Sequence, residues 1–251
     1  SRIIQPLRGA VFHRRSHFGM LMDDTYGSDL FPDIEESGQW LARPVEEPGA
    51  RPLRFERGGD LGSRLVSWPK SHVVKCLAFM HPDDPEHLQA DQIEQIRRCY
   101  DACRRVERVF LLEIVAGKHG PLTDNTVATI VRQIYATGVL PDWWKLEPQP
   151  NGAAWDNIAN VIEENDPHCA GILVLGLDKP ADQLCEDMAR AARQPLCKGF
   201  AIGRTLFAAT ARKWFSNSIS DDQAIREMGD QFSRFCTIWE NNQKPSVNSL
   251  G

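Results

Sequence analysis

The feature that most constrains the fold of this chain is a regular alternation that begins at residue 72. Apolar runs of strand length are each followed by a longer stretch with helical periodicity. The predicted strands are 72–80, 109–115, 143–147, 171–177 and 199–205, and the predicted helices are 85–106, 124–137, 154–165, 180–193, 206–216 and 220–241. Strands that alternate with helices pair in parallel, and the almost continuously apolar strands indicate a sheet buried on both faces.

Three more strands are predicted in the first 70 residues, at 9–13, 19–23 and 39–45. They bring the number of strand–helix units to eight, which is the number that closes a (β/α)8 TIM barrel. A doubly wound sheet alternates in the same way, but it usually carries a glycine-rich phosphate loop after its first strand, and none is present here. We therefore predict one TIM-barrel domain over residues 1–242 and a loose C-terminal tail at 243–251.

Two connections in this first part are unusual. The link between His13 and Gly19 is shorter than the roughly ten or more residues that a parallel crossover needs. Either these strands are not parallel neighbours, or a helical segment is missing between them, and we favour the second explanation. The stretch Pro44–Pro69, rich in Pro, Gly and Arg, is predicted to be a long loop and a candidate functional lid.

Composition argues against several classes of function. The formal net charge of −5, without a basic stripe interleaved with aromatics, argues against a nucleic-acid-binding protein. No apolar run reaches the roughly 18 residues of a transmembrane helix, and no secretory signal begins the chain, so we expect a cytoplasmic protein that does not bind membranes. Among the seven cysteines, Cys99 and Cys103 have the spacing of a metal-binding pair. No neighbour completes a ligand set, so we expect buried free thiols, no metal and no cofactor.

The candidate chemistry centres on the segment Pro141–Pro148, which reads PDWWKLEP. Side chains alternate along a strand, so Trp143, Lys145 and Glu147 share one face. Burial among tryptophans lowers the pKa of a lysine, and a neutral amine can attack a carbonyl carbon to form a Schiff base. The alternative is that Lys145 extends into solvent at the strand end and pairs with Glu147.

Two further charged residues, Lys75 and Glu113, stand within apolar strands. Inward-facing groups near the carboxyl ends of barrel strands form the active sites of such folds. The cation of Lys75 would lower the pKa of Lys145, and Glu113 or Glu147 would move protons in the carbinolamine and enamine steps. The alternative is a structural network of lysines and glutamates that fills the barrel interior.

The last two predicted strands provide a candidate phosphate site. Backbone amides at Gly176 and Gly203, with a helix amino terminus, match the usual phosphate seat of these barrels, and Arg204 adds a bidentate contact. The alternative for Arg204 is an ion pair with Glu147 or Glu113. Residues near other strand ends and on the long loop complete the candidate substrate contacts: His13, Arg14, Asp23, Arg43 and His81. A further alternative is that His81 caps the helix that follows it.

Several motifs together resemble the aldolase domain of myo-inositol catabolism. They are ARPVE at 42–46, PGARPLRFE at 48–56, VVKCL at 73–77, HPDD at 81–84, PDWWKLEP at 141–148 and GFAIGRT at 199–205. The resemblance covers nearly the whole chain. More distantly, the chain is similar to the class I tagatose-bisphosphate and sulfofructose-phosphate aldolases.

This resemblance implies a TIM barrel that cleaves 5-dehydro-2-deoxy-D-gluconate 6-phosphate to dihydroxyacetone phosphate and malonate semialdehyde, without a metal. It implies that Lys145 is the Schiff-base lysine of the sixth strand. Lys75, Glu113 and Arg204 then match the functional positions of the fourth, fifth and eighth strands. Members of that family often follow a ribokinase-like domain in the same polypeptide, so we expect such a domain as a partner, together with a homo-oligomer.

One departure from the related aldolases concerns the first strand. It usually reads Phe-Asp-His-Arg, whereas this chain has Val11-Phe12-His13-Arg14 and lacks the aspartate, a group that takes part in proton transfer. This difference favours a second hypothesis, a degenerate barrel that binds a phosphosugar and regulates or scaffolds an attached sugar kinase. A metal-dependent aldolase is a third hypothesis, but the sequence offers no histidine cluster at ligand spacing.

Overall fold

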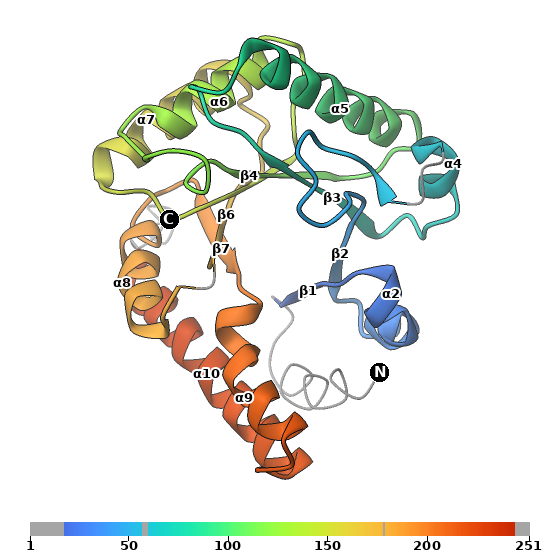
Figure 1. The fold of residues 1–251 in the computed structure, drawn as a ribbon, viewed down its shortest axis with the longest axis vertical. Coiled ribbons are helices and arrows are strands. Elements are labelled where there is room, and N and C mark those ends of the chain that lie inside the picture. Colours follow the sequence, from blue (N-terminus) through green and yellow to red (C-terminus); the bar gives the residue numbers. More distant parts are fainter. Residues whose placement is uncertain (1–17, 57–59, 178, 244–251) are drawn as a thin grey trace, which may run out of the picture.

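The computed structural model of the chain describes residues 18–56, 60–177 and 179–243. Seven strands in these ranges pair in sequence order, and every pair is parallel. Figure 1 shows the strands curving around a central space with the helices on the outside. The predicted TIM-like α/β barrel is confirmed. The predicted strand at 9–13 lies outside the described residues, so the predicted total of eight is not tested.

Strands and helices alternate along the chain. The strands are β1 (Gly19–Leu21), β2 (Trp40–Pro44), β3 (His72–Phe79), β4 (Phe110–Val115), β5 (Trp143–Leu146), β6 (Gly171–Leu175) and β7 (Cys197–Ala201). The helices are α2 (Asp24–Gly27), the 3-10 helix η1 (Ser28–Leu30), α3 (Phe31–Glu36), α4 (Leu61–Val66), α5 (Glu86–Arg105), α6 (Thr126–Tyr135), α7 (Gly152–Asn165), α8 (Ala181–Ala191), α9 (Arg204–Phe215) and α10 (Asp221–Asn242). None of the described helices has the length and apolar content that crossing a membrane requires.

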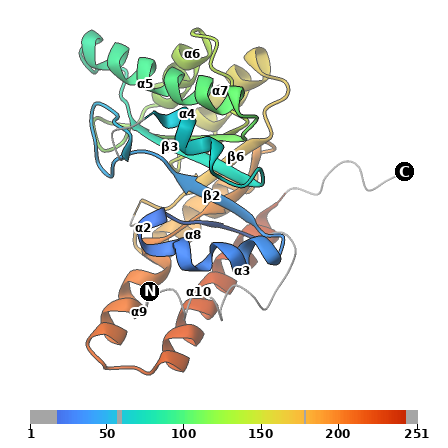
Figure 2. The same cartoon turned by 90° about the vertical axis from the view of Figure 1, so that its right-hand side faces the viewer.

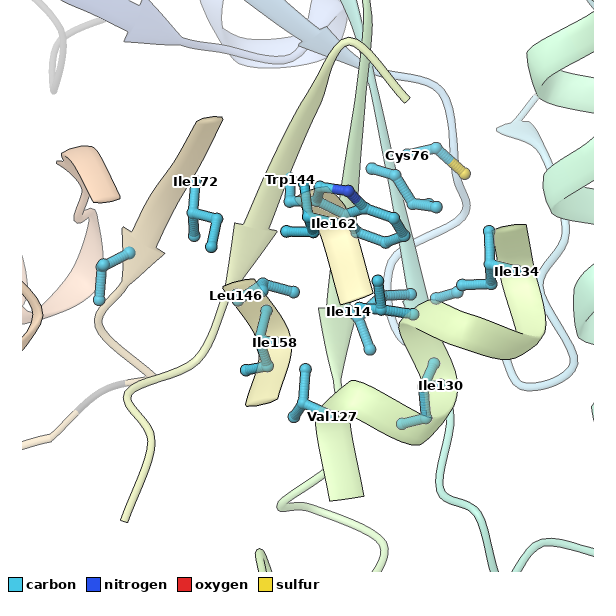
Figure 3. Packing of buried hydrophobic residues seen from close by; sticks show 14 of the residues in the cluster. Cys76, Ile114, Val127, Ile130, Ile134, Trp144, Leu146, Ile158, Ile162 and Ile172 are labelled. Atoms are coloured by element: carbon cyan, nitrogen blue, oxygen red, sulfur yellow. The ribbon is translucent and has the colours of Figure 1, made fainter. Parts of the chain in front are cut away.

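The outward face of the sheet is apolar and packs against the surrounding helices. Figure 3 shows Ile114, Trp144 and Ile172 on the strands, facing the side chains of α6 and α7. The indole Nε1 of Trp144 donates a hydrogen bond to the hydroxyl of Tyr135, 2.9 Å away. The predicted alternation in β5 is confirmed, because Trp144 and Leu146 belong to this outer core whereas Trp143 does not.

A second, smaller apolar cluster fills the inside of the barrel towards the amino ends of the strands. Ala42, Val73 and Leu111 are buried there, with Trp40, Trp143 and Leu173 packed against them. We call these six residues the inner apolar layer. Lys75, Glu113 and Lys145 lie on the same inward-facing side of their strands. The inner apolar layer therefore limits the access of water to them from the amino ends of the strands.

The two edge strands of the described sheet, β1 and β7, do not pair with each other. Helix α10 packs against residues at both edges instead. The ring of Phe232 in α10 is 5.2 Å from that of Phe18, just before β1, and 6.1 Å from that of Phe200 in β7. Figure 2 shows α9 and α10 extending together away from the sheet. Helix α10 ends at Asn242, and the predicted tail beyond residue 243 lies outside the described residues.

The structure corrects the prediction for Asp23. This residue was expected to close the second strand, but β1 ends at Leu21 and Asp23 caps α2. Its carboxylate accepts hydrogen bonds from the backbone N–H groups of Thr25 and Tyr26, both at 2.8 Å. An aspartate at this position satisfies amide groups that the first helical turn leaves without partners, which favours a helix start over a longer strand.

Two other predicted boundaries are wrong. The stretch Pro44–Pro69 was expected to be one long loop, but it contains α4, which begins after the N-cap residue Asp60 and buries Leu65. The last strand was expected to reach Thr205, but β7 ends at Ala201 and α9 begins at Arg204. The Gly and Pro content of residues 44–69 and the apolar run at 199–205 did not reveal where these two helices begin. Neither pattern shows at which residue the backbone hydrogen bonds of a helix start.

Candidate active site

Four buried charged side chains form a continuous series inside the barrel. Nζ of Lys75 lies 2.5 Å from Oε1 of Glu46 and 2.6 Å from Oε2 of Glu113. The other oxygen of Glu113, Oε1, lies 2.6 Å from Nζ of Lys145. We call Glu46, Lys75, Glu113 and Lys145 the charge chain. No side chain in it is more than 10% exposed.

Strand register explains this arrangement. In the parallel sheet Leu77 pairs with Glu113, and Glu113 pairs with Lys145, so these three residues lie side by side on the inward face. Lys75 lies two residues before Leu77 and therefore points to the same side. The structure thus brings together the three strand residues predicted from sequence. Lys145 pairs with Glu113, rather than extending into solvent beside Glu147.

The environment of Lys145 suits a nucleophilic amine. Burial lowers the pKa of Lys145 below its ordinary value, the nearby Lys75 cation lowers it further, and the Glu113 carboxylate opposes both effects. A lysine whose charged form is disfavoured supplies the neutral amine that attacks a carbonyl carbon.

The neighbours of Lys145 remain ionised. Burial acts against the charged form of Lys75, but the carboxylates of Glu113 and Glu46 outweigh it and raise the pKa of Lys75. Burial also acts to raise the pKa of Glu113, yet Lys145 and Lys75 lower that pKa to about 2. Glu113 is therefore a fixed negative charge that holds both ammonium groups, and it is a weak base.

Glu46 is the member of the charge chain that sequence reasoning missed. It follows β2, in the loop that carries the antiparallel bridge between Glu46 and Phe55. Pro44 pairs with Lys75 across β2 and β3, so a residue two positions later lies above Lys75 on the same side. The alternation of side chains along β2, continued past the end of the strand, could have predicted that Glu46 lies beside Lys75.

Glu147 lies apart from the charge chain but close to the carboxyl end of β4. Its Oε1 accepts hydrogen bonds from the backbone N–H groups of Ala116 at 2.6 Å and Gly117 at 2.8 Å. Burial raises the pKa of Glu147, and those two hydrogen bonds partly oppose the rise. A carboxyl group with a raised pKa is better suited to exchanging protons near neutral pH than Glu113 is.

His81 is buried between the ends of β3 and β4. Its Nδ1 accepts from the backbone N–H of Asp83 at 3.2 Å, and its Nε2 lies 3.2 Å from the carbonyl oxygen of Pro121. These contacts fit the tautomer with the proton on Nε2. The backbone N–H of His81 donates to the carboxylate of Asp84, and the N-cap residue of α5 is Pro85 with no side-chain cap, so His81 does not cap the helix that follows it. His81 therefore fixes the loop after β4, and its predicted contact with substrate remains untested.

Arg43 lies in β2 and points to the outside of the barrel, away from the charge chain. Its Nη2 is 2.7 Å from Oδ1 of Asp24, and its guanidinium carbon is 3.8 Å from the centre of the Trp68 ring. Nη1 of Arg43 is 3.1 Å from Nδ1 of His72. The carboxylate that Arg43 contacts is thus that of Asp24 in α2, outside the charge chain.

The predicted phosphate residues lie together at the last two strands. A methyl group on Gly176 would lie 3.3 Å from Ile202 and 3.5 Å from the hydroxyl of Thr205. Gly203 is the N-cap residue of α9, and Arg204 begins that helix. Arg204 also lines a pocket of about 800 Å³ formed by the start of α8 with α9 and α10, and Lys179 and Arg234 line it as well. The charge chain does not line this pocket.

Two predicted site residues, His13 and Arg14, lie outside the described residues. None of the seven cysteines forms a disulfide bond, and five of them are buried. In the described ranges no group of three or more His, Cys, Asp or Glu side chains is arranged to hold a metal ion.

Comparison with known proteins places the chain in a family. The family model described as "Uncharacterized protein conserved in bacteria (DUF2090)" matches residues 6–243. The chain belongs to this family. No curated protein matches the sequence.

Solved structures of other proteins share the fold of this DUF2090 member. A fructose-bisphosphate aldolase from Plasmodium falciparum aligns over 91% of this chain and 78% of its own, with a TM-score of 0.65 and 12% identity. The protein Cgl0159 from Corynebacterium glutamicum aligns over 91% of this chain and 75% of its own, with a TM-score of 0.59 and 16% identity. At these identities the likeness shows a shared barrel fold and leaves the reaction of this DUF2090 chain to be argued from its own residues.

Proposed function

We propose that this protein is a class I aldolase in which Lys145 forms a Schiff base with a ketone substrate. The observation that carries the proposal is the position of Lys145: its amine is buried, its pKa is lowered, and it lies in one charge chain with Glu113 and Lys75. The fixed carboxylate orients the amine, while burial and the second cation disfavour its protonation, as carbonyl attack requires.

The substrate that we propose is 5-dehydro-2-deoxy-D-gluconate 6-phosphate, on the basis of the motif resemblance. The neutral amine of Lys145 attacks the C5 ketone, and loss of water from the carbinolamine gives an iminium ion. A base takes the C3 hydroxyl proton, C3 becomes an aldehyde, and the C3–C4 bond breaks. Its electron pair neutralises the iminium as an enamine, and malonate semialdehyde leaves. Protonation at C4 and addition of water then release dihydroxyacetone phosphate and the free amine.

Glu147 is the proposed proton carrier in these steps. The raised pKa of Glu147 lies closer to neutral pH, which suits a group that both takes up and releases protons. Glu113, with a pKa of about 2, stays ionised. Lys75 keeps its charge through Glu46 and Glu113, so it disfavours protonation of Lys145 and binds a substrate oxygen. Gly176, Gly203 and Arg204 are the proposed phosphate contacts.

Trapping with borohydride tests the central step. Reduction in the presence of dihydroxyacetone phosphate should add the mass of the reduced ketone to Lys145. Lys145→Met should lose the adduct and about 10⁴-fold or more of the turnover, the scale expected when a covalent nucleophile is removed. Lys70→Met is the matched control, because the side chain of Lys70 is 80% exposed. A wild-type protein without the adduct, or an adduct that persists in Lys145→Met, would refute the Schiff-base mechanism.

The same experiment separates this proposal from the alternative of a degenerate regulatory barrel. A barrel that binds a phosphosugar and regulates an attached kinase would bind dihydroxyacetone phosphate in a titration, yet give neither adduct nor cleavage. Undiminished turnover after chelation of metals would exclude a metal-dependent aldolase.

A further inference from the structure

The short turn after β4, residues 116–121, is held at both ends by buried side chains. Glu147 accepts the N–H groups of Ala116 and Gly117, and His81 lies within hydrogen-bond distance of the carbonyl oxygen of Pro121. Within the turn, the N–H of His119 donates to the carbonyl oxygen of Ala116 at 2.8 Å. We call this segment the anchored turn. Lys118 and His119 are exposed residues of this turn, and the contacts at its two ends fix the position of their backbone.

The anchored turn lies at the mouth of the barrel above the charge chain. Phe79, the last residue of β3, has the same inward orientation as Lys75 and Leu77, and it is only half-buried. Nζ of Lys118 is 5.4 Å from the centre of the Phe79 ring, and the His119 ring is 5.6 Å from it. Lys118 and His119 thus lie around an inward-facing aromatic ring at the open end of β3 and β4.

The cation of Lys118 is available for a ligand. Across the described parts of the chain it forms no ion pair, whereas Arg51, which donates to the carbonyl oxygen of Phe79 at 3.3 Å, is already paired with Asp84. Partial desolvation and the nearby Arg51 and Lys118 cations lower the pKa of His119 although the Asp84 carboxylate acts to raise it, so the imidazole serves as a neutral hydrogen-bond donor.

Strand order sets the direction of a bound substrate. The Schiff-base lysine is on β5, and the proposed phosphate contacts follow β6 and β7. Because the strands pair in sequence order, the part of the substrate beyond the ketone extends in the opposite direction, towards β4 and β3. In a phosphorylated keto-sugar acid, that end carries the C1 carboxylate.

We propose that Lys118 and His119 form the subsite that recognises the carboxylate of the aldehyde fragment, and so select a keto-sugar acid over a neutral or bisphosphorylated sugar. This inference rests on the proposed function, since it places the carboxylate relative to the ketone held by Lys145. It gives Glu147 a second role, because Glu147 and His81 together position the anchored turn.

The test uses the aldol direction with dihydroxyacetone phosphate and three aldehydes. These are malonate semialdehyde, propanal, which has a methyl group in place of the carboxylate, and glyceraldehyde 3-phosphate. Lys118→Met should lower kcat/KM for malonate semialdehyde about tenfold and leave propanal within about twofold, and Lys118→Arg should restore most of the loss. The borohydride adduct on Lys145 should be unchanged, and Lys70→Met, which removes an exposed lysine elsewhere, should behave as wild type.

Other outcomes would overturn the subsite. They are an equal loss for malonate semialdehyde and propanal, no loss for either, or a wild-type preference for glyceraldehyde 3-phosphate that depends on Lys118. Binding of 3-hydroxypropionate, followed by NMR titration, supplies a readout that needs no turnover. Wild type should bind it more tightly than Lys118→Met, and equal binding contradicts the subsite even if the Schiff-base proposal itself fails.

Discussion

The Nζ of Lys145 lies 2.6 Å from Oε1 of Glu113, and the other carboxylate oxygen of Glu113 is 2.6 Å from Lys75. One carboxylate therefore serves two ammonium groups, so it cannot fully compensate both of them. Lys75 has a second partner in Glu46, at 2.5 Å, whereas among the described residues Lys145 has an ion pair with Glu113 alone. This asymmetry explains why the pKa of Lys75 is raised and that of Lys145 is lowered.

The first prediction concerns the pH dependence of Schiff-base formation. Only the neutral amine attacks, so adduct formation rises with pH through the pKa of Lys145. Lys75→Met removes a cation that lowers this pKa, so the rising part of the profile should move to higher pH. Lys75→Arg keeps the charge and should stay close to wild type. The rate of borohydride trapping between pH 5 and 10 measures it, and coinciding profiles for Lys75→Met and wild type would contradict the proposed tuning.

The second prediction concerns stability. Glu113→Gln leaves Lys145 buried without its carboxylate, and should lower the free energy of unfolding at neutral pH by about 3–5 kcal/mol. The folded-state pKa of Glu113, about 2, lies below its ordinary value of 4.5, so its stabilising effect is present above pH 4.5 and is lost as the pH falls towards 2. Urea unfolding should thus show the gap between wild type and Glu113→Gln narrowing over that range. Glu107→Gln, at an 81% exposed side chain, is the control, and a gap that does not change with pH would argue against the assignment.

The third prediction concerns the position of Glu147. A methyl group on Gly117 would lie 2.7 Å from Oε2 of Glu147, so Gly117→Ala must displace that carboxylate. We expect cleavage to slow about 10²-fold, because a proton carrier moved by about 1 Å loses its alignment. The dihydroxyacetone phosphate adduct on Lys145 should still form. Gly152→Ala is the matched control, since no atom beyond its chain neighbours and its own helix backbone lies within 4 Å of the added methyl group. Full activity in Gly117→Ala would exclude Glu147 as the proton carrier.

The fourth prediction concerns metals. In the Schiff-base mechanism the iminium nitrogen accepts the electrons of the broken bond, so a Lewis-acid metal has no step to perform. Turnover should stay within about twofold after dialysis against EDTA, measured in the same buffer before and after Zn²⁺ is added back. A loss of activity with EDTA that Zn²⁺ restores would be incompatible with the proposed mechanism.

Much of the fold was predictable because it depends on local patterns. From β3 to α10 the strands and helices agree with the predicted ones within a few residues, since long apolar runs and helical periodicity report directly on burial. The short helices α2, α3 and α4 were missed. Each has six residues or fewer, too short for a periodic pattern, and α2 and α4 begin with an aspartate cap that also fits a turn.

The sequence by itself determined that Lys75, Glu113 and Lys145 face the inside of the barrel, because a charged residue in an apolar strand keeps the orientation that alternation imposes. Only the tertiary structure decided which charges meet. The pairing of Lys75 with Glu46, the position of Lys118 beside Phe79 and the outward orientation of Arg43 depend on where loops and neighbouring strands come together. Such contacts join residues far apart in the chain, and their energies follow from distance and burial, which only the folded arrangement specifies.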